Sequence, residues 1–195
     1  MILKFDKLFL KSSSQYITNT IESGNVAILN FAEIITITEM ISLLFRLTPL
    51  QSGDITINGV SINFFDKAMI PHIVKVVMDY DNLEKISGYD YLGKIIERRS
   101  IATTLSSDEL KELIPDICST LQIDNQMLYN KISKYDYFEI LQLKLIEFMI
   151  SGAKILIVAD SKNKVNSDIF NLLDNFSKGN DVLILVITTN DSLQL

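Results

Sequence analysis

Three polar residues, Asn30, Thr36 and Thr38, lie in a short segment whose neighbours suit the binding of phosphate groups. An apolar run at residues 25–29 predicts a buried strand before the segment, and residues 41–47 predict a helix after it. A loop that cradles a triphosphate in this position is rich in glycine and ends in lysine followed by serine or threonine. The segment contains neither glycine nor lysine. The sequence therefore predicts the frame of a phosphate site without the groups that bind phosphate.

The residue types of this segment oppose the binding of an anion. Glycine lets the backbone adopt positive φ and approach a phosphate closely, whereas positive φ is an outlier for the β-branched Ile34, Ile35 and Ile37. Glu33 adds a negative charge where an anion would enter. A missing lysine also removes charge-assisted hydrogen bonds of about 1.5 to 3 kcal/mol each. We therefore expect no ordinary triphosphate binding here.

The same segment fits the start of a helix that satisfies its own amide groups. The sequence Thr36-Ile37-Thr38-Glu39 has the spacing of a capping box. In this interpretation Thr36 is the N-cap and Glu39 reaches back from the third helical position. A helix start of that kind would need no bound phosphate.

The composition is that of an ordinary globular protein. The chain has 195 residues, of which 48% are hydrophobic and 22% charged, and this length is enough for one domain with a sizeable core. The net charge of -6 gives no basic surface, so nucleic acid is not an expected partner. The single cysteine, Cys118, excludes an intramolecular disulfide, and no apolar run approaches the roughly 20 residues that span a bilayer. We expect a cytoplasmic chain that meets a membrane only through a partner.

Short, nearly continuous apolar runs predict strands that are buried on both faces, as in a parallel sheet covered by helices. Helical patterns alternate with these runs, which is typical of an α/β fold. Two other segments alternate apolar and polar side chains and predict an antiparallel sheet at the edge. The buried runs lie at residues 26–29, 74–78, 155–158 and 182–187, and the alternating segments at 2–5 and 54–57.

Further helices are predicted in a helical subdomain at about residues 88–150, within a single domain that covers residues 1–195. Ser106 or Ser107, followed by Glu109, predicts a capped helix start. Residues 138–150 predict a second long helix, which is mostly apolar around its circumference and therefore belongs in a core.

Four segments, in order along the chain, carry a resemblance to a known family. Residues 47–59, with Thr48-Pro49-Leu50-Gln51-Ser52-Gly53 leading into a strand that ends in Asn58-Gly59, are similar to the segment after a Walker A helix. Residues 76–92 look like a Q-loop strand and its continuation. Residues 135–139 occupy the place of a Leu-Ser-Gly-Gly-Gln signature. Residues 154–166 occupy the place of the Walker B strand and of the Asp-Glu-Pro-Thr-Ser-Gly-Leu-Asp segment that follows it. The chain thus resembles the nucleotide-binding (ATPase) domain of ABC transporters, and its middle looks most like the sugar-import branch. The resemblance covers nearly the whole chain and implies a P-loop NTPase-like α/β core with a mostly parallel sheet, an antiparallel edge sheet and a helical subdomain.

Every functional motif departs from the pattern of this family. The resemblance implies degenerate equivalents in place of working residues, and none of the residues 135–139 is conventional. It therefore implies a pseudo-ATPase rather than an enzyme, with no catalytic, cofactor or metal residue in working form and at most weak binding of ATP and magnesium. The degenerate positions are Asn30, Thr36 and Thr38 in the phosphate loop, Asp79 for the Q-loop glutamine, Ala159 for the Walker B aspartate, Asp160 for the catalytic glutamate and Thr189 for the switch histidine.

Asp160 allows two interpretations. If its strand is one residue longer than the apolar run, Asp160 is placed to serve as the magnesium carboxylate. Phosphates supply most magnesium ligands in such sites, however, so one aspartate without them makes a weak site. The sequence favours the second interpretation, an aspartate at the end of a strand whose side chain caps the next turn.

Three functional hypotheses follow. The first is a degenerate ABC-type domain that serves as a structural or regulatory partner of an intact ABC ATPase domain or a transmembrane permease. The second is the nucleotide-binding half of an asymmetric ATPase pair that still binds ATP for import of a sugar or another substrate. The third is an unrelated α/β enzyme with its ligand at the carboxyl ends of the strands, where Asp160 and Thr189 lie. Because nothing joins these two residues to a nucleophile or a metal set, it ranks last.

Overall fold

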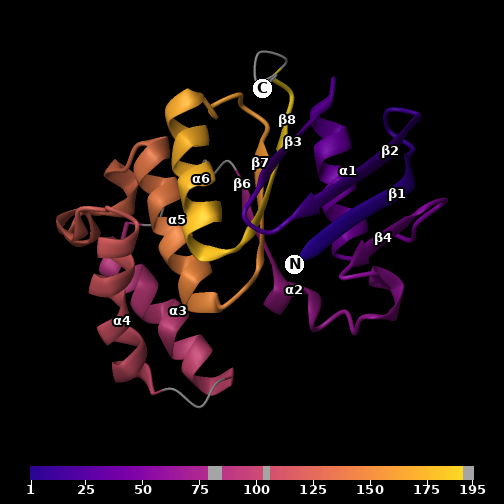
Figure 1. The fold of residues 1–195 in the computed structure, drawn as a ribbon. Coiled ribbons are helices and arrows are strands. Elements are labelled where there is room, and N and C mark those ends of the chain that lie inside the picture. Colours follow the sequence, from indigo (N-terminus) through magenta and orange to yellow (C-terminus); the bar gives the residue numbers. More distant parts are fainter. Residues whose placement is uncertain (79–84, 103–105, 191–195) are drawn as a thin grey trace. The chain divides into compact units, whose positions relative to one another are not determined.

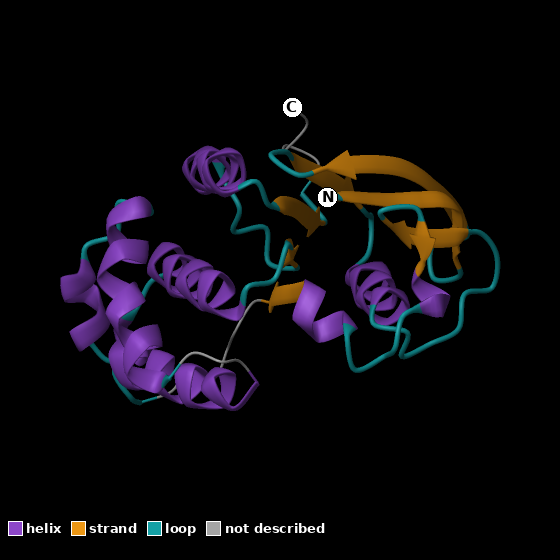
Figure 2. Cartoon of the chain, turned by 60° about the horizontal axis from the view of Figure 1, so that its bottom comes forward, coloured by secondary structure: helices purple, strands orange, loops and turns teal. Residues whose placement is uncertain are grey.

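The computed structural model describes residues 1–78, 85–102 and 106–190, and these residues form two compact units. The first unit is built from Met1–Asp79 and Ala153–Leu195, and the second from Tyr80–Gly152. Among the described residues, the first unit contains all the named strands and the second contains helices and loops, as Figures 1 and 2 show. The expected helical subdomain at about residues 88–150 lies in the second unit.

The first unit contains a parallel sheet, as the buried apolar runs predict. The strand order is β3-β8-β7-β6, and every neighbouring pair is parallel. This sheet confirms the expectation of an α/β fold. Its elements are β3 (Val26–Asn30), β6 (Val74–Met78), β7 (Ile155–Asp160) and β8 (Leu183–Thr188), with helices α1 (Ile34–Leu44), α2 (Ile70–Ile73) and α6 (Ser167–Asn180) in the same unit.

The antiparallel sheet is also confirmed, and it is separate from the parallel one. Its strand order is β2-β1-β4-β5, and Leu3 of β1 lies opposite Ile57 of β4. Asn58 and Gly59 turn the chain between β4 and β5, both with positive φ, as a tight hairpin turn requires. The strands are β1 (Ile2–Leu10), β2 (Gln15–Glu22), β4 (Asp54–Ile57) and β5 (Val60–Ser61), followed by a short 3-10 helix η1 (Ile62–Phe64).

Helix α1 joins the two sheets through one hydrophobic core. Ile37, Met40 and Leu44 of α1 are almost fully buried in a cluster that also contains residues of β1, β4, β7 and β8. Every second residue of β8, from Leu183 to Ile187, belongs to this cluster. Because side chains alternate across a strand, the residues between them face the opposite side, where α6 contacts β3 and β8. The phosphate-loop segment therefore leads into a helix that is central to the packing.

The second unit confirms the two predicted helices. α4 begins with Ser106 as its N-cap, and Glu109 completes the capping box. α5 begins in the same way, because Asp136 and Glu139 exchange backbone and side-chain hydrogen bonds of 2.8 and 2.9 Å. The unit consists of α3 (Gly88–Ala102), α4 (Ser107–Thr120), η2 (Asn125–Tyr129), η3 (Ile132–Lys134) and α5 (Tyr137–Ser151).

Candidate functional site

The connection between β3 and α1 is much shorter than the sequence predicts. Only Phe31, Ala32 and Glu33 separate the strand from the helix, which begins at Ile34 and ends at Leu44. The expected loop up to Thr38 and the expected helix over residues 41–47 are therefore corrected: Ile35, Thr36 and Ile37 are helical, and none of the residues 30–38 has positive φ. This segment contains no glycine, and its residues are helical from Ile34 onward.

This connection offers little to a phosphate. Phe31 is 5% exposed, belongs to the core, and donates its backbone N–H to the carbonyl of Thr188 at 2.9 Å. Glu33 is the N-cap in an extended conformation, and its side chain makes no capping hydrogen bond. Ile34 and Ile35 are 55% and 61% exposed at the helix start. A triphosphate would meet a carboxylate and two isoleucines here, so these residues do not fit it.

The predicted capping box at Thr36 and Glu39 is wrong, because both side chains bind a different segment. Glu39 accepts the backbone N–H groups of Lys11 at 2.9 Å and of Ser12 at 2.8 Å, in the turn between β1 and β2. The Ser12 hydroxyl donates to Thr36 Oγ1 at 3.0 Å. Because the helix starts at Ile34, residues 36 and 39 lie one turn apart on the same face. That face holds the β1–β2 turn against α1.

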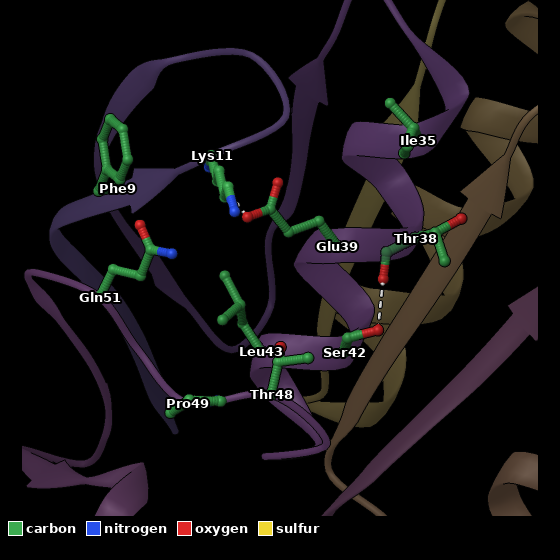
Figure 3. Close-up of a pocket in the computed structure, with 10 residues that line it drawn as sticks. All are labelled: Phe9, Lys11, Ile35, Thr38, Glu39, Ser42, Leu43, Thr48, Pro49 and Gln51. Atoms are coloured by element: carbon green, nitrogen blue, oxygen red, sulfur yellow. Dashed lines mark hydrogen bonds between the residues drawn. The ribbon is translucent and has the colours of Figure 1, made fainter.

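A pocket of about 450 Å³ lies beside this contact and is drawn in Figure 3. Its charged groups are the side chains of Lys11 and Glu39, and both carboxylate oxygens of Glu39 already accept backbone N–H groups. Aromatic and aliphatic side chains make up much of the remaining wall. The lining residues are Phe9, Lys11, Ile35, Thr38, Glu39, Ser42, Leu43, Thr48, Pro49 and Gln51.

Hydrogen bonding sets the ionisation of Glu39. Burial alone would raise the pKa of its carboxyl group, but the hydrogen bonds from Ser12 and Lys11 and the charge of Lys11 lower the pKa below its ordinary value. A carboxyl group with a lowered pKa stabilises the fold above the pKa of the unfolded chain. That stabilisation is lost as the pH falls through the lower folded-state value.

We expect Glu39→Gln to lower the free energy of unfolding at pH 7 by about 1 kcal/mol, because a neutral amide replaces one of the two charged acceptors by a donor. The difference from the native chain should be smaller at about pH 3, because the stabilisation by the native carboxylate is lost as the pH falls through its lowered pKa. Urea unfolding of both proteins at the two pH values measures this difference in the free energy of unfolding. Glu33→Gln on the same helix is the control, since Glu33 makes no capping bond. Equal losses in both variants at pH 7 would contradict the assignment.

Asp160 ends a strand, as one of the two interpretations requires, but its carboxylate caps the next turn, as the other predicts. β7 runs through Asp160, whose side chain is fully buried. Its oxygens accept the backbone N–H groups of Lys164 at 2.7 Å and Val165 at 3.1 Å, and the Thr188 hydroxyl at 3.2 Å. The carboxylate is thus committed to three donors. Its surroundings do not fit a magnesium ion, and the described residues contain no group of three or more acidic, histidine or cysteine residues able to hold a metal.

Two other sequence-predicted residues, Asn30 and Thr189, lie at the carboxyl ends of the parallel strands β3 and β8. Thr189 donates its hydroxyl to Asn163 Oδ1 at 2.9 Å, and the Asn30 amide donates to the carbonyl of Asn190 at 2.9 Å. Thr38 lies on the exposed side of α1 and lines the pocket. Asp79 lies outside the described residues. Among the described residues, the structure thus brings together Asp160 with Thr188, and Thr36 with Glu39, but no set of groups suited to catalysis.

Ser12 and Thr188 contribute to these contacts, and the sequence-based search missed both. Ser12 belongs to the run Ser12-Ser13-Ser14 after a strand, where serine is typical of turns, so the turn itself was detectable. Its partner on α1, 24 residues away, was not. Thr188 directly precedes Thr189 and ends a buried strand, so parallel pairing with β7 places it opposite Asp160.

No helix among the described residues is long and apolar enough to cross a membrane.

Comparison with known proteins gives no match to any protein-family model and none to a curated protein. Solved structures do match. CbiO1 from Clostridium perfringens, described as part of the ABC transporter complex CbiONQ, has a TM-score of 0.77 and 15% identity, over 97% of this chain and 78% of that one. A putative ABC transporter ATP-binding protein from Pyrococcus furiosus has a TM-score of 0.69 and 17% identity, over 98% and 92% of the two chains.

Proposed function

Because the chain has the α/β fold of ABC transporter ATP-binding proteins, we propose that it is a degenerate member of this class that acts without ATPase activity. Its role is that of a structural or regulatory partner in a transporter assembly. The observation that carries this proposal is the connection from β3 to α1: three residues without glycine or lysine, followed by two exposed isoleucines. A triphosphate has no cradle of backbone N–H groups there.

The positions that would perform hydrolysis support the same proposal. Asp160 is buried and both of its oxygens accept backbone N–H groups, which opposes a role in activating a water molecule. Thr189 carries no basic group, and its hydroxyl donates to Asn163. Coordinated loss at several positions favours a domain retained for its shape over a variant ATPase.

The proposed partners are an intact ATPase domain, a transmembrane permease, or both. CbiO1, whose fold this chain shares, is described as part of a transporter complex. The segment from about residue 79 to residue 93, of which residues 79–84 lie outside the described part, is the proposed contact for a cytoplasmic loop of the permease. This places the chain at the cytoplasmic face of a membrane through its partner. The likeness of the middle of the chain to the sugar-import branch belongs to the same proposal.

One observation favours the second candidate function, an ATP-binding half of an asymmetric pair. The pocket of about 450 Å³ beside α1 has an aromatic side chain, Phe9, and a lysine, Lys11, next to the former phosphate segment. A ligand held there would contact side chains rather than a phosphate loop. Any resulting affinity would come without the charge-assisted bonds that normally hold the phosphates.

We expect 1 mM MgATP or MgADP to leave the melting temperature of the chain unchanged. Binding with a Kd of about 10 μM would stabilise the protein by about 2.7 kcal/mol at this concentration, which a thermal shift detects easily. An ATP-binding protein with an intact glycine-rich loop is the positive control. A clear shift would support the second candidate, and the absence of a shift would rule out the second candidate for the isolated chain.

The partner role needs a separate measurement. We expect the chain to co-elute with an ATPase or permease encoded by a neighbouring gene, and the complex to bind MgATP only through the intact subunit. Mutating the phosphate-loop lysine of that subunit should abolish all MgATP binding in calorimetry. MgATP binding that persists in such a complex would assign a nucleotide site to this chain, and the absence of any complex would contradict the partner role.

A further inference from the structure

Strand β2 forms an open edge of the antiparallel sheet. In the order β2-β1-β4-β5, β2 pairs with β1, and no other strand of the described residues lies on its outer side. Figure 1 shows β2 as the outer strand beside β1. An edge strand presents backbone N–H and C=O groups that have no partner in the sheet, and these groups can pair with another strand.

β2 lacks the features by which proteins normally protect such an edge. It is eight residues long, whereas β5 at the other edge has only two. Its sequence, Gln-Tyr-Ile-Thr-Asn-Thr-Ile-Glu, contains no lysine, arginine or proline, and Glu22 is its one charged residue. The irregularity in this part of the sheet lies in β1, between Phe5 and Leu8, rather than in β2. Short strands, charges, prolines and bulges are the usual defences against edge pairing.

The side chains of β2 are complementary to themselves in one antiparallel register. Ile17 and Ile21 are 9% and 3% exposed and face the core, while Thr18 and Thr20 face solvent. If two copies pair symmetrically about Asn19, Ile17 lies opposite Ile21 and Thr18 opposite Thr20. A shift by one residue would place the core side of one strand beside the solvent side of the other.

The charges agree with this register. Glu22 of one copy lies opposite Tyr16 of the other, so no two carboxylates oppose each other in the paired strands. Tyr16 is 66% exposed and has room to accept a neighbour. We propose that the β2 edge binds a second copy of this chain in the antiparallel register centred on Asn19, which joins the two antiparallel sheets into one continuous sheet.

Disulfide trapping tests the register. Residues directly opposite in an antiparallel pair have Cα atoms about 4.5 to 5.5 Å apart, within the range for a disulfide. Asn19→Cys places two cysteines opposite each other on the symmetry axis, so we expect a covalent dimer under mild oxidation. Thr20→Cys is the matched control, because its counterpart lies diagonally at about 7 to 8 Å. The native Cys118 is buried and should not react.

A pair of charge variants tests the interface without a covalent bond. Tyr16→Glu and Tyr16→Lys both lose the contact with the Phe9 ring, whose centroid lies 5.1 Å away, so they differ mainly in charge. Tyr16→Glu faces Glu22 of the second copy and should weaken dimerisation about tenfold, since the dimer contains two such pairs. Tyr16→Lys should strengthen it by a similar factor. Sedimentation equilibrium as a function of protein and salt concentration measures both constants.

The outcomes separate clearly. Selective trapping of Asn19→Cys and opposite shifts for the two Tyr16 variants support the proposal. Equal trapping at positions 19 and 20 indicates random collision, and a native chain that stays monomeric at all concentrations has no such interface; either result overturns it. Circular dichroism of each variant checks that the fold is retained. These measurements are independent of ATP binding, so the proposed function and this interface can fail separately.

Discussion

Asp160→Ala is expected to lower the free energy of unfolding by about 3 to 5 kcal/mol, one of the largest effects of any single substitution in this chain. The substitution removes the acceptor of three hydrogen bonds and leaves the N–H of Val165 and the hydroxyl of Thr188 buried. Each buried donor without a partner costs about 1 to 3 kcal/mol. The loop from β7 to α6 should lose its order first.

Urea unfolding followed by circular dichroism gives the loss directly. Asp168→Ala is the control, because Asp168 is an exposed residue in the first turn of α6 and should cost less than about 1 kcal/mol through the helix dipole. If Asp160→Ala were as stable as this control, the carboxylate would not be structural. The interpretation of Asp160 as a residue kept for ligand chemistry would then regain support.

Gly53→Ala should destabilise the fold by about 4 kcal/mol, because a side chain at this position meets backbone atoms that have no room to move. A Cβ atom there would overlap the carbonyl oxygens of Lys7 and Asp6 in β1. Gly53 also has a φ of 79°, which alanine adopts at a cost of about 1 to 2 kcal/mol. The substitution must therefore push β4 away from β1, which would disturb the core that both sheets share.

Gly59→Ala separates these two causes. Gly59 has a φ of 78°, nearly the same as that of Gly53, but a Cβ atom there meets nothing within 4 Å. Gly59→Ala should therefore lower the free energy of unfolding by only about 1 to 2 kcal/mol, which is the cost of the backbone conformation alone. Thermal and urea unfolding of the two variants under the same conditions gives the difference. If both variants lost the same free energy of unfolding, the backbone of β1 would be able to move away from the added Cβ atom at little cost.

The strands were predictable from the sequence because their signal is local. The run Val182 to Ile187 is apolar at every position, which is typical of a strand buried on both faces, and all of it except Val182 lies in β8. The capped start at Ser106 was likewise predictable from residues within one turn. The start of α1 was not predictable in this way, because the capping-box spacing of Thr36 and Glu39 favours a later start than Ile34.

The candidate site was only partly predictable, and for a physical reason. Thr36 and Glu39 have the spacing of a capping box, but their hydrogen bonds go to Lys11 and Ser12, more than 20 residues away in sequence. Residues with this spacing can form a capping box at a helix start, or they can bind another segment from within the helix. Which of the two occurs depends on the residue at which the helix begins. For Asp160, by contrast, the partners Lys164 and Val165 are close in sequence, so the cap was foreseeable.

The pairing of β3 has a consequence for the order in which the protein folds during synthesis. β3 is at residues 26–30, and among the described strands it pairs only with β8, at residues 183–188. The antiparallel sheet, contained within residues 2–61, can form as soon as its own strands leave the ribosome. β3 can pair only after almost the entire chain has been synthesised, and such long-range pairing is slow. One of the first strands to be translated is thus among the last to find its place, which leaves its apolar residues for chaperones to shield.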